Sequence, residues 1–364
     1  MSKKIIAHVG FHKTGTTALQ GSFSHNRKML REAGILYPRL GQKAQHRAAW
    51  ALTERYWGWN KRGGTKFPIA EWEKLVKFSR KFKGTTLFSS EFFCELDETK
   101  IRKFKKDLDN EDVTIVFTLR PLVKLLASSY QQYLKYGITP TYEEWLHAVL
   151  DKPGKSKVTP TFWKRHEHGR VITQWANVFG AENVVVVIAD EKNPEAIFDA
   201  FNSLLGLPAK TISQLEGVAS NRSLSNEEVQ LLLEVNRKFP KERTWDDYDI
   251  FIRDGWIRHL TDKVTVSPSA EKLLTPQWAV DKAREFGADS VEKIKASGVK
   301  VVGNIDAFAL AEIPVGENLP VTHIPISLAA DALLAFDKRT IRRFGSHTFV
   351  REAKRRVKKK LRNR

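Results

Sequence analysis

The chain has 364 residues, which is enough for one large α/β domain or two smaller ones. Its single cysteine, Cys94, excludes an intramolecular disulfide and a cysteine-based metal cluster, and we expect a buried thiol. The formal net charge of +19 favours acidic partners. Residues 351–364 contribute +8 of it, so +11 is spread over the rest of the chain.

Short apolar segments alternate with helical patterns along the chain. Strands are expected in the segments KIIAHV, TTLFSSE, VTIVFTL, NVVVVIA and VKVVG, and ILYP is expected as a short extended piece that Pro38 stops. Helices are expected at 16–33, about 45–56, 68–82, 97–109, from 121 onward, 141–150, 160–179, 194–205, 226–238, 277–296 and 327–336. This alternation predicts an α/β fold of the P-loop type, with a doubly wound, mostly parallel sheet flanked by helices. Residues 41–66 are expected to form a loop or lid around the helix at 45–56.

We expect one domain over residues 1–345, with a core at 4–238 and a C-terminal extension at 239–345. A basic tail follows at 346–364. A signal-like start and an apolar run of about 18 residues are both lacking, which favours a cytoplasmic protein. The tail fits a solvated segment, a peripheral contact with the inner, anionic membrane face or a contact with an anionic glycan. Nucleic acid is not expected, because no aromatic-interleaved groove accompanies the tail.

The sequence HVGFHKTGTT, residues 8–17, follows the first strand and opens the first helix. That context suits a phosphate-binding loop, in which the amides of Gly15, Thr16 and Thr17 point at an anion. A nucleotide kinase loop has lysine directly after its last glycine, whereas Thr16 stands there and the lysine is Lys13. The simpler alternative is a strand–helix turn without a ligand.

Two further residues suit a second phosphate. Arg120 ends the strand VTIVFTL, where a magnesium-binding nucleotide kinase would carry Asp, and Ser128 lies about two helical turns later. An arginine fork and a hydroxyl could hold a phosphate together. The alternative is a structural arginine and a surface serine.

These motifs together resemble the sulfotransferases that use 3′-phosphoadenylyl sulfate (PAPS). FHKTGTT resembles their 5′-phosphosulfate loop, and the Arg120–Ser128 pair resembles their 3′-phosphate site. GILYP, WANVFGAENVVVVIAD and ASNRSLS are similar to segments of bacterial members and of glycan sulfotransferases of the heparan type. The resemblance covers residues 4 to 238.

The resemblance implies which residues bind the nucleotide. In the loop these are His12, Lys13, Thr14, Gly15, Thr16 and Thr17, and the 3′-phosphate contacts are Arg120 and Ser128. Relatives carry an Arg-Lys-Gly sequence in a late loop that this chain lacks, so Asn221, Arg222 and Ser223 are the nearest candidates there. Lys13 is placed to neutralise the charge that grows on the bridging oxygen as the O–S bond breaks. No metal is expected.

Two residues are candidates for the base that accepts the acceptor proton. Glu91 ends the strand TTLFSSE at the sheet edge, and apolar neighbours would raise its pKa. His46 is the competitor, because relatives that act on small alcohols and phenols use histidine. Placement at a strand end favours Glu91.

The sequence thus predicts transfer of a sulfuryl group from PAPS to a hydroxyl or amine, by in-line displacement, leaving adenosine 3′,5′-bisphosphate. The expected acceptor is a carbohydrate, as a glycan or glycolipid, and Trp50, Tyr56, Trp57 and Trp59 would either stack on its rings or form a core of their own. The alternatives are a P-loop small-molecule kinase and a non-catalytic module that binds anionic glycans or membranes.

Overall fold

The computed structural model describes residues 3–41, 43–215, 222–265 and 270–335, together with residues 341, 343, 345 and 346. Its centre is a six-stranded sheet in which all neighbouring strands are parallel. In spatial order the strands are β2 (Ile35–Leu36), β5 (Thr85–Ser89), β1 (Lys4–Gly10), β6 (Val113–Leu119), β7 (Val184–Ile188) and β8 (Lys300–Val302). The predicted α/β fold is confirmed. Each segment expected to be a strand forms one, and ILYP, expected only as an extended piece, contributes the two-residue strand β2.

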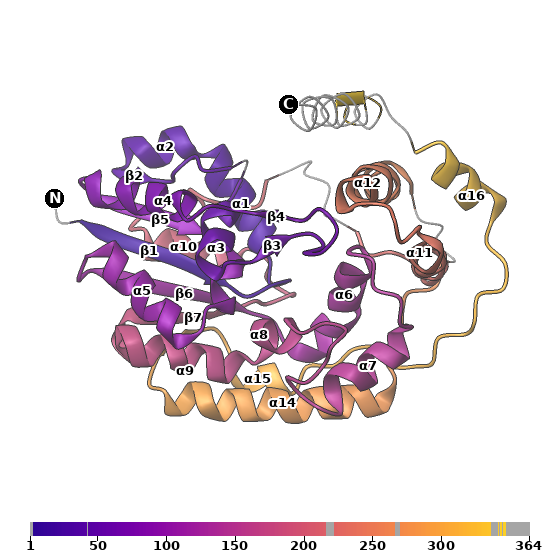
Figure 1. The fold of residues 1–364 in the computed structure, drawn as a ribbon. Coiled ribbons are helices and arrows are strands. Elements are labelled where there is room, and N and C mark those ends of the chain that lie inside the picture. The colour runs from indigo at the N-terminus through magenta and orange to yellow at the C-terminus, as the bar shows by residue number, and fades with distance from the viewer. Residues whose placement is uncertain are drawn as a thin grey trace.

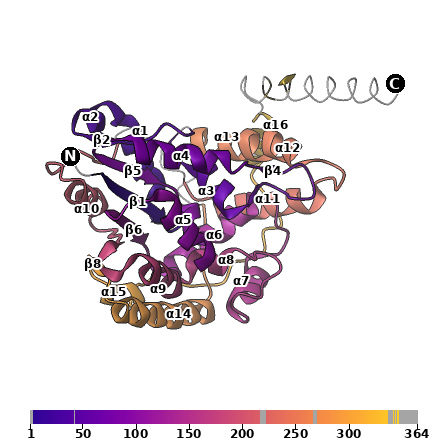
Figure 2. The same cartoon turned by 60° about the vertical axis from the view of Figure 1, so that its left-hand side comes forward.

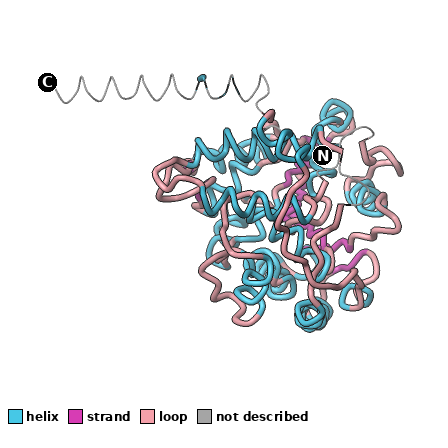
Figure 3. Tube along the Cα trace, turned by 90° about the vertical axis from the view of Figure 1, so that its right-hand side faces the viewer, coloured by secondary structure: helices cyan, strands magenta, loops and turns pink. Residues whose placement is uncertain are grey.

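Helices cover both faces of the sheet, as the burial of successive β1 side chains on opposite faces requires. Ile6 packs into a core with α1 (Thr16–His25), α2 (Arg27–Glu32) and α10 (Ala196–Leu204). Ile5 and Ala7 face the opposite core, which contains α3 (His46–Thr53), α4 (Ala70–Lys81), α5 (Glu98–Leu108) and α9 (His168–Phe179). Figure 1 shows α2 above the sheet and α9 below it, and Figure 3 shows the strands lying among the helices.

A helical region with its own apolar cluster lies beside the sheet. It comprises α6 (Leu122–Leu134), α7 (Tyr142–Leu150), α8 (Phe162–His166), α11 (Asn226–Lys238), α12 (Trp245–Tyr248), the π-helix η3 (Asp249–Ile257), α13 (Arg258–Lys263) and α16 (Ile326–Leu333). Short elements complete the chain: the hairpin β3 (Tyr56–Trp57) and β4 (Thr65–Lys66), the 3₁₀ helices η1 (Glu91–Glu95) and η2 (Ala181–Asn183), and α15 (Asp306–Ala309).

The long helix α14 (Gln277–Ala296) connects the two cores. Ala279 and Val280 belong to the helical cluster, whereas Val291 and Ile294 belong to the core of the sheet. A helix of 20 residues spans about 30 Å, so α14 reaches from α7 to α9 (Figures 1 and 2). Residues 291–309 are therefore packed onto the sheet, and β8 extends it beside β7.

The structure differs from the sequence predictions in four segments. The helix expected at 160–179 is two helices, α8 and α9, which Glu167 separates. The helix expected at 16–33 is two helices, because the chain breaks at Asn26, which caps back onto the Ser22 carbonyl. The loop expected at 41–66 contains the β3–β4 hairpin. The helices at 245–263 were not predicted, although Thr244 and Asp247 form a capping box. Among the described residues no helix is long and apolar enough to cross a membrane.

Candidate functional site

The strand order changes direction at β1, and this gathers three loops at one edge of the sheet. After β1 the chain goes to β2 and β5 on one side, and then to β6, β7 and β8 on the other. The carboxyl ends of β1, β5 and β6 carry Lys13, Glu91 and Arg120, respectively. Open α/β sheets bind ligands at such a switch point. The three predicted chemical groups thus meet at the edge where a ligand is expected.

The loop between β1 and α1 has the backbone of an anion-binding turn. Gly15 precedes α1 with a φ of 86°, and Lys13 adopts a φ of 63°, a left-handed value that few residues other than glycine take. Thr14 donates to the Phe11 carbonyl (2.7 Å) and pairs with Thr118 of β6 (2.7 Å), which ties the loop to the sheet. No side chain caps the first turn of α1, and no acidic residue lies there.

Thr16 and Thr17 begin α1 in different surroundings. Thr16 is buried, whereas Thr17 and Gly15 are exposed. Backbone amides at an uncapped helix start carry a partial positive charge that favours an anion. The predicted roles of Gly15, Thr16 and Thr17 therefore rest on an exposed, uncapped helix start.

Lys13 links this loop to α6. Its Nζ donates to Oε1 of Gln132 at 3.1 Å, across 119 positions of sequence. Burial lowers the pKa of Lys13; the charge of Glu91 opposes this, and the charges of Arg165 and Arg120 add to it. A cation held half-buried, with an amide as its hydrogen-bond partner, is available to a ligand anion.

His12, in contrast, faces inward. Its Nε2 lies 3.3 Å from Oε1 of Glu95, a buried carboxylate that also pairs with Arg55 (2.6 Å) and Arg165 (2.9 Å). Burial lowers the pKa of His12 to about 4, so the ring is neutral near pH 7. These contacts make His12 part of the packing beneath the loop. Sequence patterns do not reveal the Glu95 cluster, because its members lie far apart in the chain.

The two candidate bases, Glu91 and His46, lie side by side. His46 Nδ1 is 3.8 Å from Glu91 Oε2 and 2.8 Å from the hydroxyl of Ser90, and Gln20 donates to Glu91 Oε2 at 2.9 Å. Phe92 contacts the His46 ring with its edge (centroids 5.1 Å apart). The structure therefore places the two alternative bases, Glu91 and His46, next to each other.

The expected rise in the pKa of Glu91 is wrong. Burial acts to raise this pKa, but the charges of His46 and His12 and the hydrogen bond from Gln20 outweigh it and lower the pKa to about 2. Neighbouring polar groups, rather than the apolar strand, set the environment of the carboxylate. Glu91 is thus held ionised.

Arg120 is held by a carboxylate that the sequence did not single out. Glu191 accepts from Arg120 Nε (3.0 Å) and from Lys124 Nζ (2.6 Å). Ser128 donates to the Leu125 carbonyl (3.1 Å). Lys124 and Ser128 are four apart and share one side of α6, and Glu191 joins Lys124 to Arg120, which precedes the helix. That interval could have identified Lys124 from the sequence.

The late-loop candidates differ from the others. Arg222 makes a bidentate pair with Glu228 (both 2.7 Å) and donates to the Leu260 carbonyl (2.8 Å), so its guanidinium serves the start of α11. Ser223 is exposed and its carbonyl accepts from Arg222 (3.1 Å). Asn221 lies outside the described residues. The contacts of Arg222 give no support to a phosphate-binding role.

The aromatic residues of 50–59 pack against the protein. Trp57 and Trp59 meet Trp245 (centroids 6.1 and 5.5 Å apart), and Trp59 donates to the Tyr136 carbonyl at 2.8 Å. Trp50 is 9% exposed. Tyr56, in β3, is half-buried. The tryptophans dock the β3–β4 hairpin onto α12, which agrees with the core alternative rather than with free sugar platforms.

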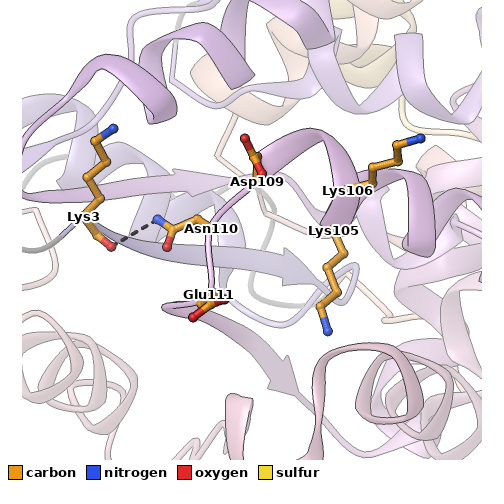
Figure 4. Close-up of a pocket in the computed structure, with 6 residues that line it drawn as sticks. All are labelled: Lys3, Lys105, Lys106, Asp109, Asn110 and Glu111. Carbon is orange, nitrogen blue, oxygen red and sulfur yellow. Dashed lines mark hydrogen bonds between the residues drawn. The ribbon is translucent and has the colours of Figure 1, made fainter.

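A surface hollow lies elsewhere on the molecule. It is lined by Lys3, Lys105, Lys106, Asp109, Asn110 and Glu111 (Figure 4). Lys3 precedes β1 and Glu111 precedes β6, so this hollow lies at the amino ends of the strands, opposite the candidate site. In the described part of the chain, no group of three or more His, Cys, Asp or Glu side chains could hold a metal ion. Cys94 is buried, as expected.

Comparisons with known proteins give a match among solved structures. No family model and no curated protein matches the chain. Among solved structures, the chain is similar to a sulfotransferase from Alicyclobacillus acidocaldarius, with a TM-score of 0.49 and 14% identity, over 85% of this chain and 99% of that chain. An identity this low says nothing about chemistry, which depends on the side chains described above.

Proposed function

We propose that this protein transfers a sulfuryl group from PAPS to a hydroxyl or amine of a carbohydrate acceptor. The observation that carries the proposal is the hydrogen bond from Lys13 to Gln132. It joins the loop after β1 to α6, whose other end carries Lys124 next to Arg120. Two cationic sites, one near each end of α6, suit a nucleotide with phosphates at both its 5′ and 3′ positions.

The residues would share the nucleotide as follows. The amides of Gly15, Thr16 and Thr17 would hold the 5′-phosphosulfate, since the first turn of α1 is uncapped. Arg120, Lys124 and Ser128 would hold the 3′-phosphate in place of Glu191, whose carboxylate Arg120 and Lys124 bind now. A phosphate would offer the same two cations more charge and more acceptor oxygens.

The reaction is a single displacement at sulfur. The acceptor oxygen bonds to sulfur as the bond from sulfur to the bridging oxygen breaks, and that oxygen leaves on adenosine 3′,5′-bisphosphate. Lys13 stabilises the negative charge that gathers on the bridging oxygen. The acceptor proton passes to a base on the protein.

His46 is the better base in this arrangement, with Glu91 as its partner. With a pKa of about 2, Glu91 is a weak proton acceptor at neutral pH. His46 Nδ1 faces Ser90 and Glu91, which leaves Nε2 for the acceptor, and the side chain is 29% exposed. The ionised Glu91 would stabilise the imidazolium that forms. Glu91 as the direct base remains the alternative.

A small-molecule kinase is the second candidate function. The loop context favours it, but Thr16 follows the last glycine, and β6 leads into Arg120 rather than a magnesium-binding Asp. A non-catalytic module for anionic glycans or membranes is the third, motivated by the basic tail.

Incubation with ³⁵S-labelled PAPS and a panel of sugars and glycolipids tests the three functions directly. Transfer of label to an acceptor, in the presence of EDTA, is expected. Phosphate transfer from magnesium ATP instead would contradict the proposal.

A further inference from the structure

Lys135 is a half-buried cation at the end of α6, and no residue in the described part of the chain forms an ion pair with it. The residue caps α6, and its backbone N–H bonds to Gln131. Within the described ranges, its ammonium has no hydrogen bond and no ion pair. The nearby cations Arg222 and Arg253 differ, because Glu228 pairs with Arg222 and Asp249 with Arg253.

The surroundings of Lys135 are strongly positive. Burial lowers its pKa to about 8, and repulsion from Lys13, Arg253 and Arg222 adds to this, while Glu228 opposes it. Arg253 also packs on the Tyr136 ring, 4.4 Å from its centroid, which fixes the guanidinium next to this turn. Holding Lys135 charged among these cations costs free energy unless an anion compensates. Because partial burial weakens screening by water, Lys135 would bind such an anion firmly.

The position of Lys135 along α6 separates it from the nucleotide. Lys124, Ser128 and Gln132 follow at intervals of four, each about 6 Å further along the helix axis. Lys13 reaches Gln132, so the reacting bond would lie at this level. Lys135 lies a further three residues, about 4.5 Å, beyond it. Along α6, Lys135 therefore lies beyond Gln132 on the side away from Lys124 and Ser128, which we propose hold the 3′-phosphate. In an in-line displacement the acceptor enters opposite the leaving nucleotide, so we infer that this end of α6 faces the acceptor.

We propose that Lys135 binds a negatively charged group of the acceptor, so that the acceptor is an anionic sugar bearing a carboxylate or sulfate besides the hydroxyl or amine that reacts. This inference rests on the proposed sulfuryl transfer. The inference adds that the acceptor is negatively charged. The phosphate-binding loop and the 3′-phosphate site concern only the nucleotide and do not specify the acceptor. Lys135 would position the acceptor and take no part in bond breaking.

Calorimetry with matched sugars tests this assignment. The probes are glucuronate against glucose, galacturonate against galactose, and glucose 6-sulfate against glucose, each titrated into protein saturated with adenosine 3′,5′-bisphosphate. At least one charged probe should bind about 10-fold or more tightly than its neutral partner. Lys135→Gln should reduce this preference to about 2-fold or less, whereas Lys135→Arg should retain it. Lys152→Gln, which removes an exposed charge elsewhere, should behave as the wild type.

The outcomes separate this inference from the proposed function. Equal binding of charged and neutral probes by the wild type, or a preference that survives in Lys135→Gln, would overturn the assignment of Lys135. A loss of bisphosphate affinity in Lys135→Gln as large as in Lys13→Gln would place Lys135 in the nucleotide site and overturn it as well. A wild-type protein that does not bind the bisphosphate would overturn the proposed function itself.

Discussion

His46 Nδ1 lies 3.8 Å from Oε2 of Glu91, and the two residues begin the helices α3 and η1, respectively. Gln20 holds the carboxylate from the other side at 2.9 Å. Glu91 is held ionised, whereas His46 keeps its ring nitrogen Nε2 available for the acceptor. This division of roles resembles a base and the group that orients it, rather than two competing bases.

Substitution of each member should separate these roles. His46→Gln should lower the turnover number by about 10²-fold or more while bisphosphate affinity hardly changes, since a base contributes to rate and little to nucleotide binding. Glu91→Gln should cost less, about 10-fold, because the imidazolium loses only its counter-charge. Single-turnover transfer from labelled PAPS measures both. A dead Glu91→Gln beside an active His46→Gln would make Glu91 the base.

Glu191 should act as a competitor for the 3′-phosphate. Its carboxylate is 46% exposed and occupies both Arg120 and Lys124. Exposed ion pairs are worth up to about 1 kcal/mol each, so Glu191→Gln should tighten bisphosphate binding about 2- to 5-fold, and Lys124→Ala should weaken it. AMP, which lacks the 3′-phosphate, serves as the control ligand and should bind all three proteins alike. Weaker bisphosphate binding by Glu191→Gln would mean that the carboxylate orients the cations instead.

Buried neutral histidines should make the fold sensitive to acid. Burial lowers the pKa of His168 to about 3, against an ordinary value of 6.5. Below about pH 6.5, His168 therefore binds a proton in the unfolded chain but stays neutral in the folded protein. The free energy of unfolding consequently decreases as the pH falls from 6.5 toward 3. At pH 5 this effect of His168 alone should lower the free energy of unfolding by about 2 kcal/mol.

Urea unfolding at pH 7 and pH 5 measures this effect. His168→Phe keeps a ring between Phe11 and Phe308 and should lose less stability between the two pH values than the wild type. The exposed His147 supplies the control, and His147→Gln should show the full wild-type loss. An equal loss in His168→Phe would show that His168 does not contribute.

The sequence predicted the sheet well because its strands are short, apolar and separated by helices. It also located Lys13, Glu91 and Arg120, since each follows a strand and parallel strands end at one edge. It failed where the environment is built by distant residues. Glu91 seemed to lie among apolar neighbours, yet Gln20 and His46 decide its charge state.

Pairing between distant residues was equally invisible in the sequence. Glu191 reaches Arg120 across 71 positions, and Lys13 reaches Gln132 across 119. The tryptophans at 57 and 59 could be placed in a core only once α12, a helix of four residues, was known. Local pattern identifies which residues follow strands, whereas tertiary packing decides what each of them contacts.

Binding of adenosine 3′,5′-bisphosphate, measured by calorimetry in EDTA beside AMP and magnesium ATP, tests the central claim most directly. The bisphosphate should bind about 10-fold or more tightly than AMP, and Arg120→Ala should remove most of that difference, because a charge-assisted contact to the 3′-phosphate is worth about 1.5–3 kcal/mol. Equal affinity for the bisphosphate and AMP, or tighter binding of magnesium ATP than of either, would contradict the account.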